Sequence, residues 1–338
     1  MQTNHHPRYF LLFALLAFPT LSQALDLKIA TLAPDGTAWM QDMRKGAEEI
    51  VSRTEGRVNI KFYPGGSMGS DRIVLRKIRA GQLHGGALTG GALGDIDPNL
   101  NIYSLPFLFR SIEELDYVRA RMDNAFAAGL EKQGFVSFGF SDGGFAYIMS
   151  NTPTRRVDDL KTQKVWIPEG DNISRALFEA LGVSPVPLPL TDVLTGLQTG
   201  LVTTIAAPGV GAITLQWHSR VKYLTDAPTV YIFAALAVDK KTFMKIAPAD
   251  QAVVRGVMEK IFTNFTRLNR IDEQNARRAL KKQGIEFVSL PPEELGILHR
   301  AAQTTIDRLA QKKVFGTEAL NAVQGHLNTY RRQPGAAR

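Results

Sequence analysis

Ser67 is the residue whose sequence setting comes nearest to that of a catalytic nucleophile. Segment 65–69 reads GGSMG, which matches the G-x-S-x-G pattern of hydrolases, and it follows a strand-like run and precedes a helical one. The preceding run, 58–63, alternates apolar and polar residues, whereas the central strand of such a hydrolase is apolar throughout. A triad also needs an acid and a histidine, and position alone nominates neither. A periplasmic hydrolase therefore remains only a remote alternative.

Metal and cofactor chemistry find little support in the residue types. Four histidines lie beyond the first 24 residues, and none has metal-ligand spacing from another: His84, His218, His299 and His326. The chain has no cysteine, which excludes disulfides, cysteine nucleophiles and thiolate metal sites. The glycines between 85 and 94 fit neither the dinucleotide nor the phosphate-loop pattern, and we expect them to allow close backbone approach. We expect no catalytic residue, no metal and no cofactor, and hence no enzyme.

Residues 1–24 have the features of a secretory signal peptide. Arg8 supplies a positive charge, 9–18 is an unbroken apolar run, and Ser22-Gln23-Ala24 has the small-x-small pattern of a cleavage site. The apolar run is much shorter than the roughly 20 residues that span a bilayer. We therefore predict cleavage after Ala24 and a soluble protein in the periplasm, with an uncleaved N-terminal anchor as the alternative.

The charge of the chain is basic but dispersed. Lys and Arg number 40 against 32 acidic residues, a net charge of +8, and no basic run is longer than a pair. Residues 331–338 form a short basic tail containing Arg331, Arg332 and Arg338. A dispersed excess indicates a solvated surface, so we expect no nucleic acid as a partner.

Strand and helix patterns alternate along the chain in two blocks, about 25–140 and 150–230. The first block predicts strands at 27–32, 58–63 and 84–89, with helices at 37–51 and 73–81 between them. The second predicts strands or extended segments at 164–167, 183–188 and 201–206, with helices at 172–181 and, capped by Thr191, up to 199. This order points to an α/β fold with a largely parallel sheet and helices on its faces.

One long amphipathic helix follows a buried apolar strand at 229–238. It begins near Pro248, a residue suited to a first helical position, and continues to Lys281 and Lys282 before Gly284. At 1.5 Å per residue it is about 50 Å long, more than one domain needs. We expect a spine shared by two domains, followed by helices at about 292–313 and 317–330.

A series of short motifs, in this order, resembles the solute-binding subunit of tripartite ATP-independent periplasmic (TRAP) transporters of the DctP type. The motifs are LAP at 32–34 with Trp39, YPGG at 63–66, LPFLF at 105–109, DLK at 159–161, KVWIP at 164–168, ALG at 180–182, PVPLP at 185–189 and GLQTG at 196–200. The resemblance covers about 25–315. It implies a two-domain periplasmic-binding-protein-like fold with hinge strands, a long spine helix and a ligand closed into the interdomain cleft.

We assign the domains accordingly. Residues 25–143 with about 235–260 form the first domain, and 144–234 with about 261–330 form the second. The resemblance also implies a small-molecule ligand and a membrane partner made of a small and a large integral TRAP transporter subunit.

Three departures from the family pattern bear on the ligand. Trp166 stands where the family usually has an arginine, which binds a ligand carboxylate through two charge-assisted hydrogen bonds. Phe145, beside Gly144, stands where many members carry another arginine, and Ala207 lies where they carry polar residues. We expect a ligand that is not a simple C4-dicarboxylate but an uncharged, apolar or aromatic molecule. Glu169 and Asp171 also allow a cationic group.

The expected ligand-binding residues are Trp39, Thr89, Gly144, Phe145, Trp166, Glu169, Asp171, Ala207 and Trp217. Two alternatives stay open for this set. Trp166 and Phe145 could serve core packing alone, or a cation such as Arg72 or Arg175 could restore the binding of acids. The same fold could also serve a sensor or an envelope partner, since fold does not decide function.

Overall fold

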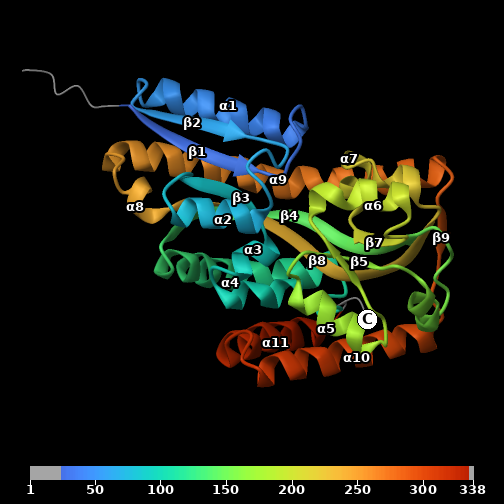
Figure 1. The fold of residues 1–338 in the computed structure, drawn as a ribbon. Helices are drawn as coiled ribbons and strands as arrows, with labels where there is room; N and C mark the ends of the chain where they lie inside the picture. The colour runs from blue at the N-terminus through green and yellow to red at the C-terminus, as the bar shows by residue number, and fades with distance from the viewer. Residues whose placement is uncertain (1–23, 335–338) are drawn as a thin grey trace, which may run out of the picture.

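The computed structural model describes residues 24–334. The predicted signal peptide, apart from Ala24, and the last four residues of the predicted basic tail therefore lie outside the described part. The long helix α9 (Pro248–Lys282) runs across most of the width of the molecule below α1 (Ala38–Arg53), and α10 (Pro292–Gln311) and α11 (Thr317–Arg331) lie along the lower edge (Figure 1). The mixed α/β class expected from the sequence is confirmed.

The central sheet is mixed, and the expectation of a largely parallel sheet was wrong. Its strands follow the order β2-β1-β3-β8-β4-β7, and β9 also pairs with β8. Strands β1 (Leu25–Thr31), β2 (Val58–Tyr63) and β3 (Gly85–Thr89) are parallel. The two longest strands, β4 (Phe135–Ser150) and β8 (Tyr223–Asp239), are antiparallel to each other. Because these two strands run through both halves of the chain, they join the halves and change the sheet from parallel to mixed.

The first half is built from β1 to β3 and the helices around them: α1 (Ala38–Arg53), α2 (Asp71–Arg79), α3 (Gly90–Gly94), the 3₁₀ segment η1 (Pro98–Ser104) and α4 (Ile112–Lys132). Thr37 caps α1 by accepting a hydrogen bond from the Met40 amide, as its side-chain type favours. Met40, Met43 and Ile50 on the buried face of α1 pack into the core with β1 and β2.

The second half carries a small parallel sheet of β5 (Trp166–Pro168) and β6 (Val186–Leu188). Its other elements are η2 (Val157–Thr162), α5 (Asn172–Ala180), η3 (Leu190–Asp192), α6 (Val193–Thr199), β7 (Thr204–Ala207), α7 (Gly209–Thr214) and η4 (Trp217–Arg220). Thr191 lies inside η3 and Asp192 precedes α6, so the predicted cap at Thr191 was wrong. The prolines at 187 and 189 shorten the strand and delay the helix.

The predicted spine helix is confirmed as α9, Pro248–Lys282, which follows the short α8 (Lys240–Phe243). It packs against α1 and β4 in one direction and α7 in the other. Phe262 and Phe265 fill the core of the first half, whereas Glu273 accepts hydrogen bonds from the Gly209 and Val210 amides at the start of α7. One helix thereby packs against elements of both halves.

The chain ends with β9 (Glu286–Val288), α10 (Pro292–Gln311) and α11 (Thr317–Arg331). Helix α10 packs against α5 in the second half. Helix α11, which our domain assignment gave to the second domain, packs against α4 in the first half, where Arg331 is paired with the buried Glu114. The domain boundaries themselves stay a prediction.

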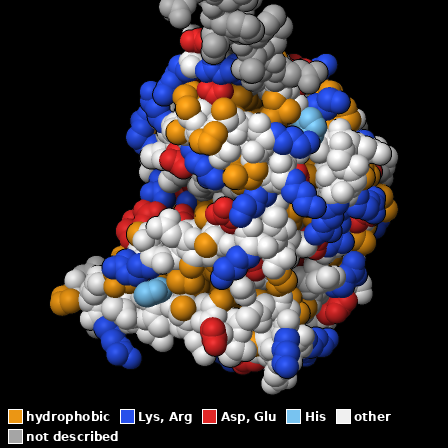
Figure 2. Space-filling model, turned by 90° about the vertical axis from the view of Figure 1, so that its left-hand side faces the viewer, with side chains coloured by type: hydrophobic (Ala, Val, Ile, Leu, Met, Phe, Trp, Pro, Cys, Tyr) orange, Lys and Arg blue, Asp and Glu red, His pale blue; other side chains and the backbone are white. Residues whose placement is uncertain are grey.

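The end face formed by the first half carries Lys and Arg side chains spread among acidic and apolar ones (Figure 2). Among residues 24–334, no helix is long and apolar enough to cross a membrane.

Candidate functional site

The two halves meet at two close contacts beyond the strands that join them. The Nη2 atom of Arg72, on α2, donates a hydrogen bond to the carbonyl oxygen of Gly170 at 3.0 Å. Gly66 has a φ of +72°, and a Cβ atom placed there would lie 2.9 Å from Cγ2 of Thr191. Segments after β2 in the first half therefore touch segments after β5 and β6 in the second, so the halves are closed on each other.

A buried carboxylate lies beside this contact, at the carboxyl end of β3. Asp71 is 8% exposed, and its Oδ2 atom accepts hydrogen bonds from the Thr89 amide at 2.9 Å and the Thr89 hydroxyl at 2.6 Å. Burial raises the pKa of Asp71, although both hydrogen bonds act to lower it. Thr89 was expected here, but Asp71 was missed. The sequence does contain a signal for Asp71. It lies in the first turn of α2, which follows β2, and the parallel strands β2 and β3 end at the same edge of the sheet.

Trp166 and Trp217 lie together in an apolar core cluster of the second half. Trp166 is 4% exposed, and its Nε1 atom donates a hydrogen bond to the Leu188 carbonyl oxygen at 3.0 Å. The two indole rings meet edge to face, with centroids 5.2 Å apart. Ala207 belongs to the same apolar cluster. Three of the expected residues are thus brought together, and the only N–H group of the Trp166 side chain is already used.

Phe145 and Gly144 lie on β4, one of the two strands that join the halves. Gly144 has a φ of +82°, and its amide donates to the Asp142 carboxylate at 2.7 Å. Phe145 is 7% exposed and meets the ring of Tyr231, on β8, edge to face at 6.0 Å. Both rings belong to an apolar cluster that reaches from the core of the first half to Ile173 on α5. Apolar and aromatic side chains from both halves are therefore in one continuous cluster. Tyr231 was not foreseen, because its pairing with Phe145 joins distant segments.

The remaining expected residues are scattered around this region. Trp39 stacks on Phe265 of α9, with centroids 5.5 Å apart, and so ties α1 to the spine. Asp171 caps α5, because its carboxylate accepts from the Ile173 amide and from the amide and hydroxyl of Ser174. Glu169 is exposed at the end of β5. Asp171 is therefore engaged locally, and only Glu169 of the two acids keeps its carboxylate in solvent.

Of the two cations considered as substitutes, Arg72 is placed at the junction of the halves. It pairs with Asp95 through Nε at 3.0 Å while it reaches Gly170. Arg175 is half-buried on α5.

Ser67 lies exposed on the turn after β2, and within residues 24–334 its hydroxyl has no hydrogen bond to a histidine or an acid. The described residues also contain no cluster of three or more potential metal ligands.

Comparison with known proteins bears on the family and the fold. Residues 29–313 match the family model described as bacterial extracellular solute-binding protein, family 7. The C4-dicarboxylate-binding periplasmic protein DctP of Rhodobacter capsulatus is 25% identical over 316 residues, which cover 91% of this chain and 93% of that protein.

Solved structures show the same fold. The TRAP periplasmic solute-binding protein of Ralstonia eutropha with bound (S)-2-acetolactate superposes with a TM-score of 0.83 at 23% identity, covering 90% of this chain and 99% of the other. The corresponding protein of Xanthobacter autotrophicus with bound β-D-galacturonate gives a TM-score of 0.82 at 21% identity, covering 89% and 99%.

Proposed function

The chain belongs to family 7 of the bacterial extracellular solute-binding proteins, and within this family we propose that the solute it captures is not a simple C4-dicarboxylate. The chain is an extracytoplasmic TRAP-type solute-binding protein that binds a small organic ligand. Its relatives bind varied acids, among them acetolactate and galacturonate, so family membership leaves the ligand of this chain open.

The state of Trp166 carries the proposal. Its side chain has no charge, its single N–H group is bonded to Leu188, and its ring is packed on Trp217. A carboxylate facing Trp166 would find neither a positive charge nor a spare donor on that side chain. Leaving a polar or charged group buried without a partner costs several kcal/mol, or more for a full charge. A dicarboxylate would meet that cost at one end at least.

The character of the neighbouring surface favours an apolar or aromatic body in the ligand. Phe145, Tyr231 and Ile173 supply apolar area where the two halves meet, and burying apolar surface is favourable at about 25 cal/mol per Å². Aromatic side chains also favour flat ligands through edge and stacking contacts. The buried Asp71 beside Thr89 could accept a hydrogen bond from a hydroxyl or amino group of the same ligand.

A second candidate is a ligand with a single carboxylate bound by Arg72. The position of Arg72 favours it, because the guanidinium already reaches from α2 to Gly170 in the other half. In that case one end of the ligand is an acid and the remainder is apolar. Trp166 still offers no charge or spare donor to a second carboxylate.

We further propose that the exported form begins at Leu25, that it performs no chemistry on its ligand, and that it delivers the ligand to the integral subunits of a TRAP transporter. Service to a sensor remains the alternative partner role. A thermal-unfolding panel tests the ligand class, with C4-dicarboxylates and sugar acids on one side and neutral aromatics, aromatic monocarboxylates and amines on the other. A ligand present at 100 times its dissociation constant adds about 2.7 kcal/mol of stability. Stabilisation by C4-dicarboxylates alone would overturn the proposal.

A further inference from the structure

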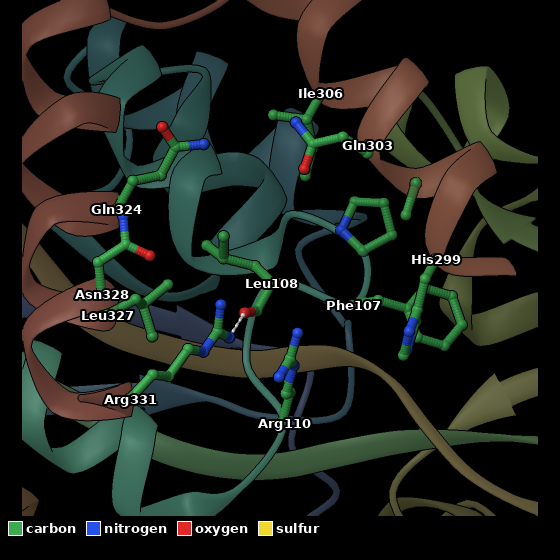
Figure 3. Close-up of a pocket in the computed structure, with 12 residues that line it drawn as sticks. Phe107, Leu108, Arg110, His299, Gln303, Ile306, Gln324, Leu327, Asn328 and Arg331 are labelled. Carbon is green, nitrogen blue, oxygen red and sulfur yellow. Dashed lines mark hydrogen bonds between the residues drawn. The ribbon is translucent and has the colours of Figure 1, made fainter. Parts of the chain in front are cut away.

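A cavity lies away from the contact of Arg72 with Gly170, between α10, α11 and the loop that precedes α4. Its volume is about 360 Å³, within the range of small-molecule sites. Figure 3 shows His299 and Gln303 of α10 on one side and Gln324 and Asn328 of α11 on the other, with Arg110 and Arg331 along the lower edge.

The two arginines differ in what they bind. Arg331 is held by the buried Glu114 through bonds of 2.7 and 2.8 Å, and it also donates to the Leu108 carbonyl oxygen at 2.9 Å. Within residues 24–334, the Arg110 guanidinium takes part in no hydrogen bond or ion pair, and its side chain points into the cavity (Figure 3). Since Glu114 is already paired with Arg331, the charge of Arg110 is left available.

Amide groups complete the polar lining. Gln324 and Asn328 supply N–H donors from α11, at a spacing of one helical turn. The Gln303 amide nitrogen donates to Asp307 at 2.8 Å, which leaves its oxygen as the atom free to accept. An anion at Arg110 would thus meet further donors from one side and an acceptor from the other.

Most of the other lining residues are apolar, which favours an organic ligand over an inorganic ion. Phe107 stacks edge to face on His299 with centroids 5.3 Å apart, and Leu108, Ile306 and Leu327 line the same cavity. Phe107 has a φ of +53°, in the left-handed region that non-glycine residues rarely adopt, and its amide donates to Thr229 on β8 at 2.7 Å. Such a backbone conformation persists only where the surrounding contacts hold it in place, as the contacts of Phe107 with Thr229 and His299 do here.

We propose that this cavity is a second ligand site, which binds a small organic carboxylate through Arg110, with Gln324 and Asn328 as additional donors. A guanidinium fork matches the geometry of a carboxylate, and the apolar floor accepts the carbon skeleton. The site is separate from the junction where Arg72 and Gly170 meet, and it does not depend on which solute is bound there.

His299 provides a local reporter. Partial burial, together with the guanidinium groups of Arg110 and Arg331, lowers the pKa of His299. An anion in the cavity would offset these positive charges and raise that pKa again.

The experiment is a citrate titration of the exported protein, labelled selectively at histidine and followed by NMR, with the His299 resonance assigned through His299→Gln. Sodium chloride at equal ionic strength is the control for screening. We expect a saturable change at His299, with His84, His218 and His326 unaffected, and an affinity at least tenfold weaker in Arg110→Gln.

Two variants locate the effect. Arg300→Gln removes the same charge from the residue next to His299 but outside the cavity lining, and it should bind citrate like the wild type. Gly66→Ala perturbs the contact between the halves and should also leave citrate binding at His299 unchanged. A His299 resonance that does not respond, or a response that survives Arg110→Gln, would overturn the proposal.

Discussion

The Nε1 atom of Trp166 lies 3.0 Å from the carbonyl oxygen of Leu188 and donates its hydrogen bond there. This contact joins β5 to the last residue of β6 and uses the one polar group of the Trp166 side chain. Where the family pattern leads us to expect an arginine, the chain therefore has a side chain whose polar contact lies within its own half.

Replacement of Trp166 separates its contribution to stability from its effect on ligand preference. Trp166→Phe removes the hydrogen bond but keeps an aromatic ring, so we expect a loss of about 1 kcal/mol in the free energy of unfolding and the same ligand preference. Trp166→Arg places a guanidinium at this position and should give measurable affinity for succinate. Calorimetric titration of both variants checks this. If Trp166→Arg has the ligand spectrum of the wild type, Trp166 does not face the ligand.

Gly66 and Gly65 form a matched pair for testing closure of the halves. Both have positive φ, +72° and +64°, but an added Cβ would meet Thr191 only at Gly66. Gly66→Ala and Gly65→Ala should each destabilise the protein by roughly 1–2 kcal/mol through backbone strain. Only Gly66→Ala should also weaken ligand binding, because it obstructs the contact across the junction. Equal effects of the two variants on affinity would show that this contact does not form in the bound state.

Arg72→Gln removes the hydrogen bond to Gly170. Since Arg72 is partly exposed, its hydrogen bond should contribute a free energy at the lower end of the range for charged hydrogen bonds. We therefore expect an about tenfold loss of affinity for all ligands alike. Arg76→Gln, on the exposed face of the same helix, is the control and should bind normally. A loss confined to ligands with a carboxylate would instead support the second candidate, in which Arg72 binds an acid directly.

Asp71→Asn tests the buried carboxylate through its pH dependence. The pKa of Asp71 is raised by burial, so above its unfolded-state value, near 3.8, the native state binds more protons than the unfolded state. The charged form therefore costs stability as pH rises towards neutrality. Asn keeps an oxygen for Thr89 and carries no charge. We expect Asp71→Asn to melt higher than the wild type at pH 7 and at the same temperature near pH 4. A variant that melts lower at pH 7 would contradict this account.

The sequence predicted the spine helix to within a residue at each end, because local signals mark both. Pro248 suits the first turn, and Gly284 lies beyond the last cations with a φ of +89°. Helix α4 was missed although Ser111 caps it and Leu115, Val118 and Met122 have helical spacing. The antiparallel pairing of β4 with β8 has no local signal, since it joins distant segments, and the mixed sheet was missed for that reason.

Some of the residues expected to bind the ligand lie close together, and their role in binding stays a prediction. Trp166, Trp217 and Ala207 were expected and lie together. Asp171 was expected to face a ligand, but its hydrogen bonds are spent at the start of α5, a role that its position before a helix could have indicated. The bond from Trp166 to Leu188 could not have been predicted, because it depends on how β5 and β6 pair.

The most direct test of the central claim is a calorimetric titration of the exported protein with succinate. The titration uses the Arg110→Gln variant, so that succinate binding in the cavity beside Arg110 does not add to the measured heat. We predict no binding at millimolar succinate, alongside clear binding of the solute that gives the largest stabilisation in the panel. Micromolar affinity for succinate would contradict the account, and would mean that a cation other than one at position 166 binds the dicarboxylate.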